Sequence, residues 1–494
     1  MKSFLVAVLL VQIAGILSLD YYDVLLYDYS SKSGENAKDI MHHNLENIHS
    51  LLETTKKLDI VVFPEYGLTS INITKENVAE FAIEVPFAEA QPYGDNFDSD
   101  YLNRLSVIAK EKIINLVVNV LEKDTKSGKY YNTNLFFSNE GQLIYRYRKI
   151  NLSEWEKRFL TAGTELGIFK FPKIDIKFAT LIGEDILHYN PAIDSIAERD
   201  VTNVIHTSAM QSVLPFMGSL PLFSGFAKKY GLNLLTSSYN NPRTGRGGSG
   251  MFYPEGNHFK HISTGPSTTP LLRTVRNLNV KVPEKVCDSK VNPRSLETVN
   301  GTVSRGLVGG KPSLDKYEYI ADIEKNQNLY KLTKIVEGVN NVTVCTNDIC
   351  CKIDVDLQKT SPTDAVYVAA AYYNKNTDLY GCGFLSCADN NLSNCGQRID
   401  DAEKLTFKDV TISAKNKYTK INAYNIPVAM LSNYLDFDHY TYCVDETNGI
   451  VMKSDVAKDV IVYGFIGHIT SGASILTSNI FLLTLIFAYL YKLF

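Results

Sequence analysis

The chain has 494 residues, of which 45% are hydrophobic and 21% charged, and its formal net charge is −4. This length and apolar content are ample for sizeable cores and favour two or more domains. The small acidic balance excludes the strongly basic surface typical of nucleic-acid-binding proteins, so no nucleic-acid partner is expected.

The first 19 residues are expected to be a signal peptide. Lys2 precedes the apolar run FLVAVLLVQIAGIL, and small and polar residues follow it around Ser18 to Asp20. The run is too short and too early for a stable membrane span. A buried N-terminal helix is the alternative.

The segment 471–494 has the order of a GPI-attachment signal. Ser471 is followed by Gly472 and Ala473, then by a short polar spacer and an apolar tail. This order predicts attachment at Ser471 with removal of the tail. An ordinary membrane anchor with Lys492 near its end is the alternative. Either anchor predicts a protein on the extracellular face of the cell membrane, with the lipid membrane as a partner; a secreted form is a further alternative.

Cysteine usage supports an extracellular location. All eight cysteines lie in the second half, and an even number in a secreted chain predicts disulfides, whose pairing the spacing leaves open. They are Cys287, Cys345, Cys350, Cys351, Cys382, Cys387, Cys395 and Cys443. Their spacing is unlike that of a zinc ribbon, and no metal or other cofactor is expected. Five glycosylation sequons also fit a secreted chain. These are Asn72, Asn151, Asn300, Asn341 and Asn391.

Strand-like and helix-like patterns alternate between residues 20 and 275. DYYDVLLYDY and LDIVVFPE are predicted strands, separated by a helix with Met41, Leu45, Ile48 and Leu52 on one face. A second predicted helix, YLNRLSVIAKEKI, precedes the strand candidates INLVVNVLE, YYNTNLFFS and QLIYRYRKI. IKFATLI, VTNVIHTS and GLNLLTSSY continue the series. This alternation predicts an α/β domain with both sheet faces covered.

Beyond about Val280 the pattern changes to short strands with cysteines. VNNVTVCTN, CCKIDVDL, AVYVAAAYY and DVTISAK predict β structure. We therefore expect a smaller, mostly β, disulfide-stabilised domain over residues 276–465. The glycine-rich stretch Arg243 to Gly250 lacks the lysine–hydroxyl ending of a phosphate-binding loop and is expected to be a surface loop.

Three positions are candidates for chemistry. Glu65 follows the buried strand LDIVVFP, at the sheet edge where α/β folds gather ligands, and partial burial would raise its pKa toward that of a base. Lys149 shares a strand face with Tyr145 and Tyr147, so it is a candidate for an inward-pointing ammonium held by Glu65 or Glu156. The alternative, which the strand pattern alone favours, is a solvated basic edge strand. Gly183 ends the apolar run IKFATLI, where a strand-to-helix turn often presents a nucleophile. Taken singly, each residue also has an ordinary structural explanation.

The order VVFPE, NTNLFFSNEGQLIYRYRKINL, IGEDILHYNPA and GSGMFYPEG resembles the nitrilase superfamily of carbon–nitrogen hydrolases. NDICCKIDVDL and LYGCGFLSC resemble the cysteine motifs of its vanin (pantetheinase) and biotinidase branch. The resemblance spans nearly the whole mature chain. It implies an αββα sandwich over residues 20–275, a vanin-type domain after it, and hydrolysis of linear amides such as pantetheine.

The resemblance also implies a Glu–Lys–Cys triad. Glu65 takes the position of the general base, Lys149 that of the cation stabilising the tetrahedral intermediate, and Glu156 that of a second glutamate that positions the lysine. The nucleophilic cysteine falls at Gly183, and no cysteine occurs before Cys287. Because the thioester intermediate requires a thiolate, the chain is expected to be an inactive or strongly impaired amidase.

Two alternatives remain. The chain is an active amide hydrolase that uses water or a substitute nucleophile such as Thr207 or Ser208, or it is a surface-held glycoprotein that keeps the pocket for a small amide ligand or for interactions. The sequence leaves the oligomeric state open.

Overall fold

The structure is a computed structural model, which describes residues 21–55, 57–86, 100–197, 201–278, 287, 320–399, 401–414, 424–445 and 449–469. The predicted signal peptide, the GPI segment with Ser471, and the sequon at Asn300 lie outside these residues. Within the described ranges, none of the helices combines the length and hydropathy that a membrane crossing requires.

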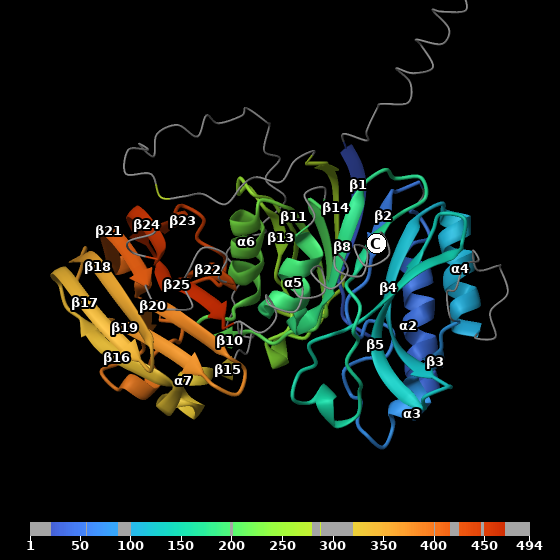
Figure 1. Ribbon diagram of the computed structural model, residues 1–494, viewed down its shortest axis with the longest axis horizontal. Helices are drawn as coiled ribbons and strands as arrows, with labels where there is room; N and C mark the ends of the chain where they lie inside the picture. The colour runs from blue at the N-terminus through green and yellow to red at the C-terminus, as the bar shows by residue number, and fades with distance from the viewer. Residues whose placement is uncertain are drawn as a thin grey trace, which may run out of the picture.

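The first unit contains two stacked sheets (Figure 1). The first sheet has the order β14 (Thr269–Arg276), β1 (Tyr21–Asp28), β2 (Ile60–Val62), β4 (Asn115–Asp124), β5 (Lys129–Phe137) and β6 (Leu143–Arg148), with β3 (Ile83–Glu84) beside β4. The second has the order β13 (Phe259–His261), β12 (Ser249–Phe252), β11 (Asn233–Ser238), β9 (Asn203–Ser208), β8 (Lys177–Ile182) and β7 (Ile168–Lys170). Strands β1, β2 and β4 run parallel, as do β8, β9 and β11.

Helices cover the outer face of each sheet. On the first sheet these are α2 (Ala37–Leu51), α3 (Val78–Phe81) and α4 (Asp100–Lys112); on the second they are α5 (Tyr189–Ile196) and α6 (Ser219–Tyr230). Met41, Leu45 and Ile48 are buried on α2, as the helical spacing predicts. A separate apolar core, with Val24 and Ile60 from one sheet and Phe178 and Ile205 from the other, fills the space between the sheets. The predicted αββα sandwich is confirmed.

The second unit is an antiparallel β sandwich. One sheet has the order β16 (Tyr330–Ile335), β19 (Val366–Asn374), β20 (Leu379–Cys387), β25 (Val460–His468) and β22 (Tyr424–Leu431). The other has the order β17 (Gly338–Thr346), β18 (Ile349–Lys359), β21 (Leu405–Ala414), β24 (Gly449–Lys458) and β23 (Thr441–Asp445). Side chains alternate between buried and exposed along β18, as expected for a strand with one face on a core. The predicted mostly β domain is confirmed; its expected end at residue 465 lies inside β25.

All eight cysteines form disulfides in or onto this second unit. The pairs are Cys287–Cys443, Cys345–Cys350, Cys351–Cys382 and Cys387–Cys395. Cys351 lies on β18 and Cys382 on β20, so this bond joins the two sheets of the sandwich. The adjacent Cys350 and Cys351 enter different disulfides.

The two units meet along α6, which lies between the second sheet and β22 (Figure 1). Gly225 of α6 lies against the Pro427 carbonyl so closely that a Cβ at this position would overlap it, so glycine is required for this approach. Short strands β10 (Val213–Leu214) and β15 (Ile320–Ala321) pair across the same boundary. The second unit also contacts the α/β unit near the candidate elbow, since the Tyr424 hydroxyl donates to the Ile186 carbonyl.

The expectation of a surface loop from Arg243 to Gly250 is wrong. Gly245, Gly247 and Gly248 are buried, and the stretch continues into β12. Its backbone crosses close to the Ser219 side chain at Gly248, which has a φ of +95°. Close approach therefore explains Gly248, and the positive φ values of Gly245 and Gly247 explain glycine at those two positions.

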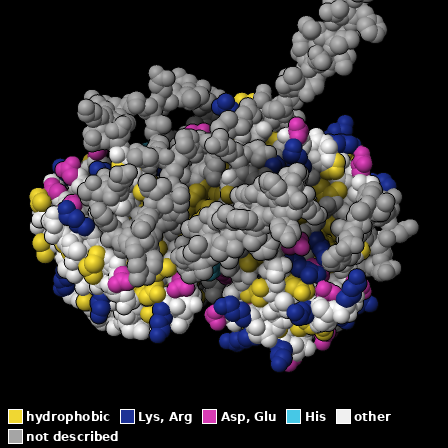
Figure 2. All heavy atoms as spheres, in the orientation of Figure 1, with side chains coloured by type: hydrophobic (Ala, Val, Ile, Leu, Met, Phe, Trp, Pro, Cys, Tyr) yellow, Lys and Arg dark blue, Asp and Glu magenta, His cyan; other side chains and the backbone are white. Residues whose placement is uncertain are grey.

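On the face drawn in Figure 2, Lys and Arg side chains are interspersed with Asp and Glu side chains over both units. This distribution agrees with the near-balanced composition of 50 basic and 54 acidic residues. The prediction that nucleic acid is not a partner stays a prediction.

Candidate active site

Lys149 directly follows β6 and is buried, on the same side of the chain as Tyr147. Tyr147 is 2% exposed and Lys149 1% exposed, whereas Arg146 and Arg148 point the other way and pair with Glu122. The predicted alternation along this strand, with Lys149 facing inward, is therefore confirmed. Burial alone would lower the pKa of Lys149, but Glu156, Glu184 and Glu65 outweigh it and raise that pKa well above its usual value, so the ammonium stays charged.

Glu65 lies just beyond the end of β2 and is 1% exposed. Its Oε1 accepts hydrogen bonds from Lys149 Nζ and from Asn132 Nδ2, both at 2.8 Å. Its Oε2 accepts a hydrogen bond from the backbone N–H of Ala209 at 2.6 Å. Burial raises the pKa of Glu65 to about 7, although Lys149 opposes this shift. A carboxylate with this pKa is suited to act as a general base near neutral pH.

Glu156 begins the short helical turn η1 (Glu156–Arg158) and faces Lys149 from the other side. Its Oε2 accepts hydrogen bonds from Lys149 Nζ at 2.8 Å and from the Ser153 backbone and hydroxyl. Its Oε1 accepts hydrogen bonds from Asn132 and from the Tyr66 hydroxyl. Burial would raise the pKa of Glu156, but Lys149 and these hydrogen bonds outweigh it and lower that pKa. Glu156 is thus the permanently charged partner of the lysine.

Gly183 follows β8 and starts the tight turn η2 (Gly183–Leu187). Its φ of +48° lies in the left-handed region, which strains any residue with a side chain. A Cβ built on Gly183 would point at the charged groups, 2.7 Å from Glu65 Oε2 and 2.8 Å from Lys149 Nζ. Position 183 therefore has the geometry of an elbow that presents a side chain to a base and a cation, but glycine supplies no reactive atom.

Several polar groups hold this elbow in place. The fully buried Asp185 accepts hydrogen bonds from the Tyr147 hydroxyl, from the backbone of Ile182, and from the backbone and side chain of Asn151. The elbow is thereby tied to β6, the strand that ends just before Lys149. On the other side, His206 Nε2 lies 3.0 Å from the Gly183 carbonyl oxygen and must carry the proton, because a carbonyl only accepts. Burial lowers the pKa of His206 to about 4, so this ring is neutral at pH 7.

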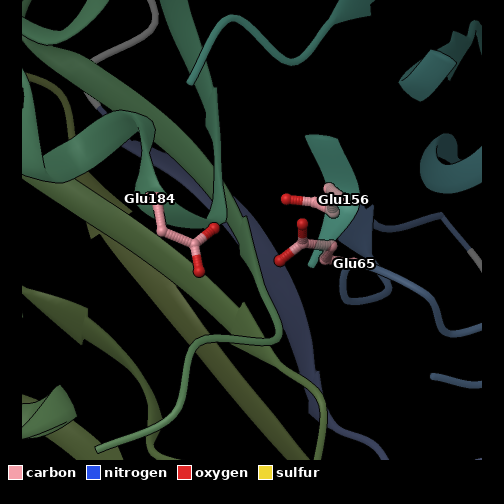
Figure 3. A group of neighbouring side chains, drawn as sticks. All are labelled: Glu65, Glu156 and Glu184. Carbon is pink, nitrogen blue, oxygen red and sulfur yellow. The ribbon is translucent and has the colours of Figure 1, made fainter. Parts of the chain in front are cut away.

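A third carboxylate, Glu184, completes the cluster and was not among the predicted site residues. Its Oε2 lies 2.6 Å from Lys149 Nζ. In Figure 3, Glu184 comes from the turn after β8, and it faces Glu65 and Glu156, which lie across the gap. Oxygens of these three residues lie within 4.8 Å of one another, close enough to hold a metal ion. The Lys149 ammonium bonds to all three, however, so a metal ion would have to displace this charge; the donor set fits an ammonium better.

Asn132 and Tyr66 also belong to the site and were missed. Both hydrogens of the Asn132 amide are donated to glutamates, one to Glu65 and one to Glu156. Asn119 in turn donates to Asn132 Oδ1 and accepts from the Tyr66 backbone. The one available signal was the alternation of Asn132 and Asn134 within the apolar strand YYNTNLFFS, because buried asparagines on a strand need partners.

The substitute hydroxyls have other partners. Thr207 donates to Asn134 Oδ1, and the Ser208 oxygen accepts from the Met210 backbone. Among the described residues, neither hydroxyl is hydrogen-bonded to Glu65 or Lys149. Their neighbour Ala209 reaches the base instead, through its backbone N–H.

The four described sequons differ in their surroundings. Asn72, Asn341 and Asn391 are exposed. Asn151 is half-buried, and its Nδ2, the atom that a glycan would occupy, donates to Asp185 Oδ1 at 3.2 Å and to the Asn190 carbonyl at 2.8 Å. The glycosylation predictions remain open, but Asn151 has a structural role beside the elbow.

Comparison with known proteins identifies both units. Residues 35–217 match the carbon-nitrogen hydrolase family, and residues 321–470 match the vanin C-terminal domain. The chain is 25% identical over 428 residues to a pantetheinase from Bos taurus, with 80% of each chain covered. It is also 25% identical over 448 residues to a biotinidase from Mus musculus, with 78% of this chain and 82% of that protein covered. The chain thus belongs to the vanin/biotinidase branch of the carbon–nitrogen hydrolase (nitrilase) superfamily.

Proposed function

We propose that the chain is a vanin-like carbon–nitrogen hydrolase family member whose amidase chemistry is absent or strongly impaired. The observation that carries this proposal is Gly183 at the elbow that faces Glu65 and Lys149. All eight cysteines are in disulfides, so no thiol elsewhere in the chain is free to replace it. Acyl transfer in this superfamily depends on a thiolate, and loss of one member of a cooperating catalytic unit costs nearly as much as loss of all of it.

The retained groups define the chemistry that this site still supports. Glu65 keeps a base-like pKa of about 7, and Lys149 keeps its charge. A base beside a cation orients water or a polar ligand, but it forms no covalent intermediate. If the site still binds a ligand, the names of the relatives, pantetheinase and biotinidase, suggest a linear amide.

The test is turnover of a pantetheine-like amide by the purified protein and by its Glu65→Ala variant. We expect no turnover above the uncatalysed rate in either. Turnover by the wild type that Glu65→Ala abolishes would refute the proposal and favour water or a substitute hydroxyl as nucleophile. Thr207→Val and Ser208→Ala variants would then tell these apart.

The disulfides and the vanin homology indicate an extracellular protein. We propose further that it is held at the cell surface by a GPI anchor at Ser471, since small residues, a spacer and an apolar tail follow in the required order. Treating expressing cells with a phosphatidylinositol-specific phospholipase C is expected to release the protein. Retention on the cells would favour a membrane-spanning tail, and full recovery in untreated medium would favour secretion.

A further inference from the structure

All three N–H donors of Lys149 are hydrogen-bonded to carboxylates of the protein, so none is available to a substrate. An ammonium has three N–H donors and no acceptor. Here the three acceptors are Glu65 Oε1 at 2.8 Å, Glu156 Oε2 at 2.8 Å and Glu184 Oε2 at 2.6 Å. Stabilising an oxyanion at this site requires at least one of these donors. One carboxylate must therefore leave before Lys149 can act.

Glu184 is the carboxylate held least firmly. Its side chain is 28% exposed, whereas those of Glu65 and Glu156 are 2% and 1% exposed. The other two are fixed by further donors from Asn132, the Ala209 backbone and Ser153. Among the described residues, the Glu184 carboxylate is hydrogen-bonded to Lys149 alone. It reaches the cluster from the solvent side.

Glu184 lies next to Gly183 in the turn η2. It directly follows Gly183, and the charged groups lie close around that glycine. A Cβ at 183 would lie 2.7 Å from Glu65 Oε2 and 2.8 Å from Lys149 Nζ, which is closer than Cβ atoms approach other heavy atoms. Lys149, held by Glu184, therefore occupies space that a side chain at 183 would need.

We propose that the Glu184 carboxylate occupies the position beside Lys149 Nζ where the oxyanion of a substrate would bind. This would prevent catalysis even if a thiol were present at position 183. Without Glu184, the third N–H of Lys149 is free to donate to a small external carboxylate or another oxyanion. The proposal rests on the proposed function only in treating Lys149 as the oxyanion-stabilising cation.

Acetate binding tests the block without requiring catalysis. The melting temperature of full-length Glu184→Ala is measured as sodium acetate replaces sodium chloride at constant ionic strength. We expect a saturable rise of at least about 1 °C in Glu184→Ala and none in the wild type, because a ligand that binds only the folded state stabilises it. Glu46→Ala, which removes an exposed partner of Arg104 away from the site, is the matched control and should behave as the wild type. An equal response of all three proteins would overturn the proposal.

Glu184→Gln is a second variant for the case in which the alanine variant does not fold. Its amide oxygen keeps one hydrogen bond to Lys149 but removes the charge, so acetate is expected to compete more easily than in the wild type. No acetate response above that of the wild type would count against the proposal.

Introducing a cysteine at position 183 distinguishes the effect of the missing thiol from the effect of Glu184 on Lys149. We compare turnover of a pantetheine-like amide by Gly183→Cys and by Gly183→Cys/Glu184→Ala. The double variant is expected to be at least about tenfold faster, since Lys149 regains a free donor and room to move. Equal rates in two active variants would overturn the block. If neither variant turns over, the acetate shift alone decides the proposal, whereas turnover by the wild type would contradict the proposed function instead.

Discussion

The two units of the chain differ in what reinforces their apolar cores. The α/β unit contains no cysteine, and at its centre it buries a lysine among glutamates and asparagines. The β unit carries every disulfide, and its interior is largely apolar, with rings such as Tyr367, Phe384, Phe407 and Tyr463 stacked between its sheets. Both units have apolar cores, but one also depends on the mutual compensation of buried charges and the other on covalent bonds.

This difference bears on why Glu65 and Lys149 stand beside a glycine at position 183. Removing a thiol costs a buried ion cluster little, because Glu65, Glu156 and Lys149 still satisfy one another. Removing one of the charges leaves the others buried without compensation. Stability alone is therefore enough to retain the base and the cation, and their presence is not by itself evidence of activity.

The largest expected effect comes from Lys149→Met. This change leaves three neighbouring carboxylates without their cation and is expected to lower the free energy of unfolding by about 3–5 kcal/mol. Fluorescence of Trp155, the single tryptophan, follows the unfolding of the α/β unit, because this ring packs on Tyr66 beside the site. The exposed Lys157, paired with Glu154, supplies the control, and Lys157→Met should change little. Equal losses in the two variants would contradict the view of the cluster as a stabilising unit.

The β unit is expected to respond to its disulfides. Replacing Cys351 and Cys382 by alanine opens a loop of 31 residues and should cost about 4 kcal/mol on the loop-entropy estimate. Replacing Cys345 and Cys350, which are 5 residues apart, should cost about 2 kcal/mol. The loss of stability in both variants is measured by unfolding followed with circular dichroism. If the unfolding transition followed by Trp155 fluorescence shifts as much as the one followed by circular dichroism, the disulfides do not stabilise the β unit separately from the α/β unit.

A smaller effect is expected from pH through Glu65. Its pKa is about 7 in the fold against 4.5 ordinarily, so the folded state holds a proton that the unfolded chain releases. Stability from this group is therefore fully present below about pH 4.5 and falls as pH rises to about 7, by up to about 1.4 kcal/mol per pH unit. Glu65→Gln should lose this slope in urea unfolding at pH 5, 6 and 7. Asp185, whose pKa burial raises to about 6, contributes equally in both proteins. Parallel pH profiles would contradict the raised pKa.

The smallest effect concerns the sequons. Asn151→Gln should lower stability by about 1 kcal/mol, because its amide bonds Asp185 and Asn190, and should leave the glycan mass unchanged. Asn72→Gln should do the reverse, removing a glycan without a measurable loss of stability, because Asn72 is exposed. Mass spectrometry and thermal unfolding of the two variants provide the measurements. A glycan on Asn151 would show that its Nδ2 does not make the hydrogen bonds to Asp185 and Asn190.

Periodicity and motif order were sufficient for much of this architecture. Alternation along YRYRK placed Lys149 on the face of the two tyrosines, but the motif order was needed to favour an inward ammonium over a solvated edge strand. The strand end at Pro64 predicted a partly buried Glu65 with a raised pKa. Asn132, Tyr66 and Glu184 were missed because their roles depend on which strands lie side by side and on how the turn after β8 is directed. Spacing alone also cannot pair eight cysteines, since the pairing depends on which strands of the sandwich face each other.

The complete pairing of the native cysteines has a practical consequence. Because none of the eight is free, Gly183→Cys would give the molecule its single free thiol, beside Glu65 and Lys149. The rate at which maleimides of increasing size label this position would then report how open the path from solvent to Glu65 is. The position at which the family places its nucleophile would thus report how accessible the charged cluster is from solvent.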